Sequence, residues 1–291
     1  MTSFYLQLLV NGLIAGSVYA MIAVGLTMVY GVCRFINFAH GELVAWAAYL
    51  CWMLTSPRID MPFWAAVPIA LAFTALLGLI QNSVMFQPLK NKGAVSLLIA
   101  SIGMSYFLRS AIQFFWGSDI VAFNLPVSRG LMLLGLSITR TQLLMAAAAV
   151  AFFGILWFLL NRTLLGKSLR AVSDHQELAG IMAIDLKKSF RAVWALAALF
   201  AGSGGILLAV DTNLEPMMGL ANLVKAFAAV LLGGAGNVWG ALAGGIMIGV
   251  AENLSVAFVP TDYKDFIAFA AILLLLLVRP QGIFSVATGV R

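Results

Sequence analysis

The fold is decided by residues 222–253, NLVKAFAAVLLGGAGNVWGALAGGIMIGVAEN. Two apolar arms flank a glycine-rich centre, and together they exceed the roughly 20 residues that cross a bilayer as one helix. Irregular backbone at membrane depth is tolerated only where it is buried in protein or lines a watery cavity. The stretch therefore predicts a hairpin of two half-helices that meet at 233–236, or else one long tilted helix.

The whole chain has the composition of an integral membrane protein. Of its 291 residues, 63% are hydrophobic and 10% are charged, whereas soluble domains have about 45–50% apolar and about 25% charged residues. Apolar runs occupy residues 4–32, 41–54, 62–86, 94–116, 141–160, 189–210, 222–251 and 266–278. We expect residues 1–291 to form one all-α, polytopic membrane helical bundle with about eight hydrophobic segments. Some segments are expected to be broken or re-entrant, and the short run 41–54 is the second candidate.

Charged residues predict how the bundle is oriented. The net charge of +6 does not indicate a nucleic-acid partner, because the basic residues lie in short loops between apolar runs. The loop 162–191 and the stretch 87–93 are rich in Lys and Arg, so we expect both in the cytoplasm. The acidic connections 211–222 and 252–265 are then external, which favours the hairpin. The side of the N-terminus stays open.

A polar cluster, NFAHGE, precedes the short run and contains Asn37, His40 and Glu42. A carboxylate that faces lipid costs several kcal/mol, so Glu42 is expected to face protein or water. One role for it is to cap or pin the start of the second segment, where backbone N–H groups lack partners.

Small residues recur at the four-residue spacing that lets helix backbones approach closely. They are Gly12, Gly16, Gly236, Gly240, Gly244, Gly245 and Gly249. These glycines pack helices within one subunit, or they form an interface between subunits.

The most informative polar stretch is NRTLLGKSLRAVSDHQELAGIMAIDLKKSF, residues 161–190. Ser173 or Asp174 is expected to cap a short helix, with Gln176 or Glu177 three residues on, as in a capping box. An apolar face follows at helical spacing, formed by Leu178, Ile181 and Met182. This face packs either on the end of the bundle or on a partner protein.

The chain is not expected to be an enzyme. It has no G-x-x-x-x-G-K-[ST] motif, so any ATP must be bound by a partner. Ser203 and His40 are not brought together by any motif, and His40-x-Glu42 lacks the cysteine ligands of a zinc deaminase. Cys33 and Cys51 have no metal-ligand spacing, so we expect no metal site. A channel or an ion-coupled secondary transporter, which also uses broken helices, is the remote alternative.

Four ordered stretches cover nearly the whole chain and resemble the permease subunits of branched-chain (hydrophobic) amino acid ABC importers. They are NGLIAGSVYAMIAVGLTMVYGVCRFINFAHGELVAWAAYL, GKSLRAVSDHQELAGIMAIDLKKSFRAVWALAALFAGSGGILLA, EPMMGLANLVKAFAAVLLGGAGNVWGALAGGIMIGVAEN and RPQGIF. The chain looks most similar to the shorter of the two paired permeases.

The resemblance implies a multi-pass protein of the bacterial inner (plasma) membrane, surrounded by lipid. Its partners would be a second related permease, two cytosolic ABC ATPases and a periplasmic substrate-binding protein. ATP and Mg would be bound by the ATPases, and this chain would hold no cofactor. Branched-chain amino acids are the expected solutes, with urea, short amides and small carboxylates as alternatives within the same family.

The resemblance also assigns residues. The loop 162–188 would be a coupling loop that docks on an ATPase, and the positions that match the family are Arg170, Ala171, Asp174, Glu177, Ala179, Gly180 and Ile181. Ala183 departs from the family, where glycine is expected, which puts the local turn geometry in question. The translocation pathway would pass Asn37, His40, Glu42, Gly233, Gly234, Gly236 and Asn237. There the first three would either fix a broken backbone or meet the polar head of the solute.

Overall fold

The computed structural model describes residues 2–90, 92–123, 130–133, 136–260, 263, 266, 269–270, 273, 277 and 282–284. Its elements are α1 (Thr2–Cys33), α2 (His40–Thr55), α3 (Phe63–Gln81), the π-helix η1 (Asn82–Phe86), α4 (Gln87–Leu89), α5 (Ala94–Trp116), β1 (Leu131–Leu133), β2 (Leu136–Ile138), α6 (Arg140–Arg162), α7 (Leu164–Asp174), α8 (Gln176–Ile181), α9 (Leu186–Asp211), α10 (Met218–Gly233) and α11 (Val238–Ser255). The two short strands pair as an antiparallel hairpin. The predicted all-α bundle is confirmed, and most of the eighth hydrophobic segment lies outside the described residues.

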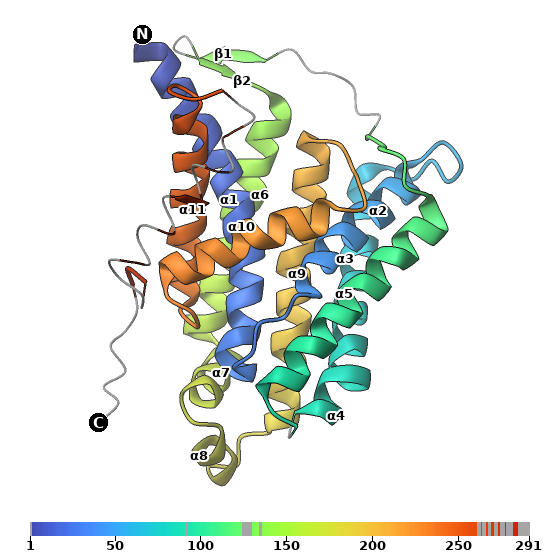
Figure 1. Cartoon of the computed structure of the whole chain (residues 1–291), viewed down its shortest axis with the longest axis vertical. Helices are drawn as coiled ribbons and strands as arrows, with labels where there is room; N and C mark the ends of the chain where they lie inside the picture. Colours follow the sequence, from blue (N-terminus) through green and yellow to red (C-terminus); the bar gives the residue numbers. More distant parts are fainter. Residues whose placement is uncertain are drawn as a thin grey trace.

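Helix α1 is the centre of the bundle (Figure 1). Its 32 residues give a length of about 48 Å, more than the roughly 30 Å of a bilayer core. It packs most extensively on α11 and α9. Every residue from 18 to 29 is buried, so this part of the helix is enclosed on all sides.

Within the described residues, six helices are long and apolar enough to cross a membrane: α1, α3 with its extension to Leu89, α5, α6, α9 and α11. Helices α2 and α10 have 16 residues each, which gives about 24 Å and is too short to span the bilayer core. Helix α10 runs obliquely across the middle of the bundle (Figure 1). The prediction that some hydrophobic segments are broken is therefore confirmed.

The stretch that decides the fold forms a hairpin. Helices α10 and α11 pack on each other and are joined by a turn over residues 234–237, in which Gly234 and Gly236 have φ angles of +93° and +90°. Glycine adopts this backbone conformation without steric cost. A Cβ on Gly233 or Gly240 would overlap the backbone of the other. The alternative of one long tilted helix is wrong, because the chain reverses direction at these glycines.

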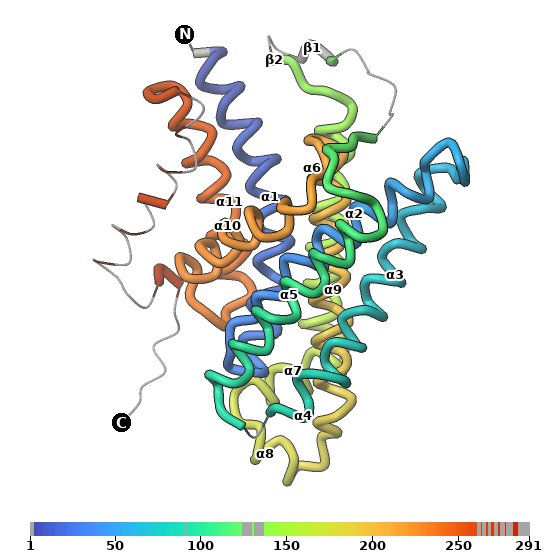
Figure 2. Tube along the Cα trace, turned by 45° about the vertical axis from the view of Figure 1, so that its right-hand side comes forward, coloured from blue at the N-terminus to red at the C-terminus, as the bar shows by residue number. Residues whose placement is uncertain are grey.

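The basic loops and the acidic connection before α10 lie at opposite ends of the bundle, as the charges predict (Figure 2). Helices α4, α7 and α8, with the basic loops around them, lie together at one end. The start of α10 is reached from the opposite end, where the start of α1 and the β1–β2 hairpin also lie. The N-terminus, whose side the charges left open, is therefore opposite the basic loops. Asp262, Lys264 and Asp265 lie outside the described residues.

Glycines bring α1 and α11 into backbone contact. A Cβ on Gly12 would lie 2.8 Å from the Cα of Val250, and one on Gly16 would lie 2.8 Å from the Cα of Ile246. Gly245 faces Ala20 and Gly249 faces Gly16 in the same way, while Gly244 approaches Ala229 of α10. These glycines are thus placed at helix contacts within the chain.

We expect Gly249→Ala to destabilise the fold, because its methyl group would overlap the backbone of Gly16. Overpacking costs typically 1–3 kcal/mol, more than the roughly 1 kcal/mol that alanine gains in helix propensity. The melting temperature of the detergent-solubilised protein should fall. Gly154→Ala on α6 is the matched control, because a Cβ there meets open space, and it should leave the melting temperature unchanged or raise it. Equal effects of the two variants would contradict the backbone contact.

Candidate functional site

The loop between α1 and α2 is fixed by hydrogen bonds inside the bundle. The Oδ1 atom of Asn37 accepts from the backbone N–H of Ala39 at 3.0 Å. His40 begins α2, and its Nε2 lies 3.1 Å from the carbonyl oxygen of Ile22 on α1. Since a carbonyl only accepts, Nε2 donates in this contact. Asn37 and His40 are fully buried.

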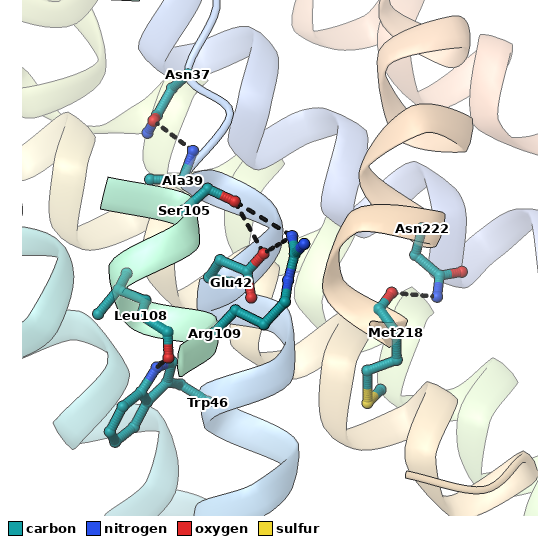
Figure 3. Close-up of polar contacts among 9 residues, drawn as sticks. All are labelled: Asn37, Ala39, Glu42, Trp46, Ser105, Leu108, Arg109, Met218 and Asn222. Atoms are coloured by element: carbon teal, nitrogen blue, oxygen red, sulfur yellow. Dashed lines mark hydrogen bonds and ion pairs between the residues drawn. The ribbon is translucent and has the colours of Figure 1, made fainter. Parts of the chain in front are cut away.

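Glu42 lies in the first turn of α2 and is fully buried. Its Oε1 accepts from Nη2 of Arg109 at 2.5 Å and from Oγ of Ser105 at 2.9 Å (Figure 3). One turn further on, the indole N–H of Trp46 donates to the carbonyl oxygen of Leu108 at 3.1 Å. The partners all belong to α5, so these contacts tie the beginning of the short α2 to a spanning helix. The carboxylate faces protein, as predicted.

The first turns of α2 and α10 touch each other inside the bundle. A Cβ on Gly41 would lie 2.5 Å from the carbonyl oxygen of Gly219, so neither position has room for a side chain. In the next turn of α10, Nδ2 of Asn222 donates to the carbonyl oxygen of Met218 at 2.8 Å (Figure 3). The positive ends of two helix dipoles are therefore close together, and Glu42 in the first turn of α2 is a favourable counter-charge.

A second buried ion pair connects α10 and α11. Nζ of Lys225 lies 3.0 Å from Oε1 of Glu252 and donates to the hydroxyl oxygen of Tyr19 at 3.3 Å. Only 11% of the lysine side chain and 1% of the glutamate side chain are exposed. The prediction that Glu252 belongs to an acidic external connection is wrong, because its charge is paired within the bundle.

The glycine turn is capped at α11 and docked on α1. Oδ1 of Asn237 accepts from the backbone N–H groups of Trp239 and Gly240, both at 3.1 Å, which is the geometry of an N-cap. The backbone N–H of Gly236 donates to Oγ1 of Thr27 at 3.0 Å. The turn is therefore held in place by side chains on both of its sides.

A small cavity of about 70 Å³ lies between the two predicted pathway elements. Its lining residues are Leu26, Tyr30, Ile36, Phe227, Val230, Leu231 and Ala235. Ile36 belongs to the loop before α2, and Ala235 belongs to the glycine turn. Asn37, His40 and Glu42 thus gather at the start of α2, whereas Gly233, Gly234, Gly236 and Asn237 lie at the far end of α10.

The predicted coupling loop folds into α7 and α8 at one end of the bundle (Figure 1). Thr163 caps α7, whereas α8 follows His175, whose side chain makes no capping hydrogen bond. The predicted capping box at Ser173 or Asp174 is therefore wrong. The reason is that α7 continues through Ser173 and Asp174, so His175 precedes α8. Oγ of Ser173 instead donates to the carbonyl oxygen of Gly31 on α1 at 3.1 Å.

The apolar face of this segment is exposed. The exposed fractions are 57% for Leu178, 79% for Ile181 and 77% for Met182. Ile181 is also one of the positions that match the family. Of the remaining ones, Arg170, Asp174, Glu177 and Gly180 are exposed, Ala171 is half-buried and Ala179 is buried. The side chains of α8 that point away from the bundle therefore form a mixed apolar and charged surface.

The turn after α8 has the geometry that glycine favours, although Ala183 occupies it. Ala183 has φ of +60°, its N–H donates to Gly180 at 3.2 Å, and the N–H of Ile184 donates to Ala179 at 3.1 Å. These two hydrogen bonds define a Schellman motif. The departure from the family residue thus leaves the turn intact and strains its backbone.

Residues 8–276 match the family described as "Branched-chain amino acid transport system / permease component". The chain belongs to this permease family. It is similar to the high-affinity branched-chain amino acid transport system permease protein LivH of Salmonella typhimurium, with 33% identity over 97% of this chain and 96% of the relative. BraD of Pseudomonas aeruginosa, a permease protein of the same description, is 32% identical over 97% and 96%. The ribose import permease protein RbsC of Escherichia coli is 28% identical over 94% and 86%.

Family membership and the spanning helices make the permease a multi-pass protein of the inner membrane. Four members of the buried polar contacts were not predicted from the sequence: Arg109, Ser105, Lys225 and Thr27. Part of the signal was available, because an arginine in the apolar run 94–116 and a lysine in 222–251 are expected to have buried partners. Thr27 carries no such signal, since its partner is a backbone N–H.

In the permease, Glu42→Ala should leave the buried guanidinium of Arg109 without its carboxylate partner. Breaking a buried pair by removing one side typically costs 3–5 kcal/mol, whereas replacing both sides with apolar residues is far milder. We expect Glu42→Ala to lower the melting temperature strongly and the double variant Glu42→Met with Arg109→Met to restore much of it. A double variant less stable than Glu42→Ala would contradict the proposed energetics of this pair.

Ala183→Gly should stabilise the turn after α8, because alanine in the left-handed region costs about 1–2 kcal/mol. Part of that gain is offset by the greater freedom of glycine in the unfolded chain. Hydrogen exchange at the amides of residues 183 and 184 should slow by a few-fold. The control is Ala192→Gly, inside α9, where glycine should destabilise the local structure instead of stabilising it. Faster exchange in Ala183→Gly would contradict the strain assigned to this turn.

Proposed function

We propose that the permease is the membrane subunit of an ATP-driven importer that translocates branched-chain or other hydrophobic amino acids. A periplasmic binding protein delivers the solute. A second related permease completes the membrane part, and two cytosolic ATPases bind ATP and Mg and supply the energy. The observation that carries this proposal is the exposed apolar face of α8 at the end of the bundle where the basic loops lie.

The exposed face of α8 supports a partner protein as its occupant. Its side chains lie on a segment anchored to α1, so the exposure is built into the fold. Exposed apolar residues that are flanked by charges are typical of a protein–protein contact. Arg170, Asp174 and Glu177 supply the charged rim. We propose that this surface, residues 170–182, docks on an ATPase.

The proposed pathway runs beside the two interrupted helices. Asn37, His40 and Glu42 engage other groups of this chain, which supports the role of fixing a broken backbone over direct capture of the solute. Gly233, Gly234, Gly236 and Asn237 form the turn on the other side of the small cavity. The largely apolar lining of that cavity suits an aliphatic side chain, and the contacts there are expected to be weak, as an importer must release its solute.

The named relatives support amino acids as the first choice of solute. LivH and BraD are described by their branched-chain amino acid systems. The similarity to a ribose import permease supports a membrane fold that serves more than one solute class, with selection by the binding protein. Urea, short amides or small carboxylates are therefore the alternative within the same mechanism. A channel or ion-coupled transporter is the remote alternative, and transport by this chain alone would favour it.

The test is affinity purification of the permease from its native host in mild detergent. Recovery of a second permease and two ATPases, with ATP hydrolysis stimulated by the binding protein, is the expected result. Thermal-shift screening of that binding protein with leucine, isoleucine, valine, urea and small acids then identifies the solute. A permease that is recovered alone, without ATPase activity, would overturn the proposal.

A variant sharpens the docking assignment. Ile181→Glu with Met182→Glu should abolish co-purification of the ATPases, because two charges would be buried in an apolar contact. The permease itself should keep its melting temperature, since both side chains are mostly exposed. Phe258→Glu, at a residue that is 79% exposed and follows α11, is the control and should not release the ATPases. Normal ATPase recovery with the double variant would show that this face docks nothing.

A further inference from the structure

The end of α1 is bound by the coupling segment, residues 163–184. Helix α1 stops at Cys33, so the last carbonyl groups of the helix have no donors within it. The carbonyl oxygen of Gly31 accepts from Oγ of Ser173 at 3.1 Å, and that of Val32 accepts from Nε2 of Gln176. The two side chains therefore replace the next turn of α1.

Arg34 adds a third contact, in which the donor belongs to the end of α1 and the acceptor to the coupling segment. It has φ of +56°, and its backbone N–H donates to the carbonyl oxygen of Tyr30 at 2.8 Å, which closes the end of the helix. Its Nη2 donates to the carbonyl oxygen of Ser173 at 2.7 Å. Ser173 is thus held through both its side chain and its backbone, so the coupling segment cannot shift without displacing the end of α1 or losing these contacts.

The glycine turn between α10 and α11 is bound to the same two turns of α1. The N–H of Gly236 donates to Oγ1 of the fully buried Thr27 at 3.0 Å. Gly31 lies between the two bound segments, because a Cβ there would be 3.2 Å from Oγ of Ser173 and 3.7 Å from the Cα of Gly236. One residue without a side chain therefore contacts both the coupling segment and the turn.

The turn has the backbone freedom to respond to a shift of α1. Gly234 and Gly236 are both in the left-handed region, and glycines of this kind absorb large changes of φ and ψ at hinges. Helix α1 itself is enclosed over residues 18–29, so its end moves as part of a rigid rod. A displacement at Gly31 is then passed on as a displacement at Gly236.

We propose that residues 27–34 of α1 are a relay that transmits movement of the coupling segment to the 234–237 turn, a role that rests on the proposed function. Ser173 is the positioning residue on the coupling side of the relay. Thr27 is the positioning residue on the side of the turn. Neither has to touch the solute, and both act through the hydrogen bonds described above.

The experiment is a double-mutant cycle in the complete importer complex reconstituted in liposomes, with radiolabelled leucine as the probe. Ser173→Ala removes one hydrogen bond of the relay, and Thr27→Val removes the other while conserving shape. Each single variant should lower the leucine transported per ATP hydrolysed by about fivefold, the effect of one ordinary hydrogen bond. The double variant should be no worse than either single variant, because both interrupt the same relay. Co-purification of the ATPases should be unchanged.

Two controls separate the relay from a local packing effect. Thr27→Ser keeps the acceptor oxygen and should transport normally. Ser168→Ala lies on the same helix as Ser173, but its hydroxyl donates to Leu164 of α7 itself, and it should also transport normally. If Thr27→Val lowers the yield of complex, Thr27→Ala replaces it, and Arg34→Gln repeats the cycle through a separate contact on the coupling side.

The outcomes distinguish the relay from the proposed function. Single variants that transport normally, or a double variant in which the two losses multiply to about 25-fold, would overturn the relay while the wild-type complex still imports leucine. A wild-type complex that assembles without ATPases would overturn the proposed function and the relay together. Loss of ATPase recovery in Ser173→Ala would place this residue in docking and would also overturn the relay.

Discussion

The structure depends on how the ends of its interrupted helices are hydrogen-bonded. Helices α2 and α10 begin within the packed bundle, whereas α1 ends and α11 begins at partly exposed positions. Each of these ends leaves backbone groups without partners in its own helix. Side chains meet several of these groups, some from neighbouring positions and some from distant parts of the chain. Asn37 and Asn237 accept from backbone N–H groups at two such ends, and Ser173 and Gln176 donate to the carbonyl groups at a third. Breaks in the helices are thus possible because their cost is met within the fold.

The same constraint explains where the buried charges lie. Glu42 connects the short α2 to α5 through Arg109, and Lys225 connects the short α10 to α11 through Glu252. A helix that does not span the bilayer has no lipid interface at one of its ends to hold it at a given depth. A paired charge fixes its position along the neighbouring helix, and buried pairs are best understood as setting such registry rather than adding stability.

The sequence predicts the helical class and the hydrophobic segments well, because both follow from local composition. It predicts the hairpin through Gly233 and Gly236, since closely spaced glycines in an overlong apolar run favour a turn over a continuous helix. It fails where the partner is distant in the chain. Ser173 has the local pattern of a helix cap, but α7 continues past it, and its hydroxyl donates to Gly31, 142 positions away. Glu252 has the local pattern of an acidic loop, and only Lys225 on the neighbouring helix reveals that it is buried. The partner of Glu42 is 67 positions away and could not be chosen among the basic residues.

The glycine contacts between α1 and α11 have a mechanical consequence. Helices that meet through side chains can slide past each other as the side chains change rotamer. Two backbones in direct contact cannot rearrange in this way. These two helices therefore move as one rigid body. Any change of shape during transport must occur at interfaces made by side chains, such as those around α5 and α6. A pair of spectroscopic labels on α1 and α11 would then keep a constant separation through the cycle. That pair provides the fixed frame against which the movements of the other helices can be measured.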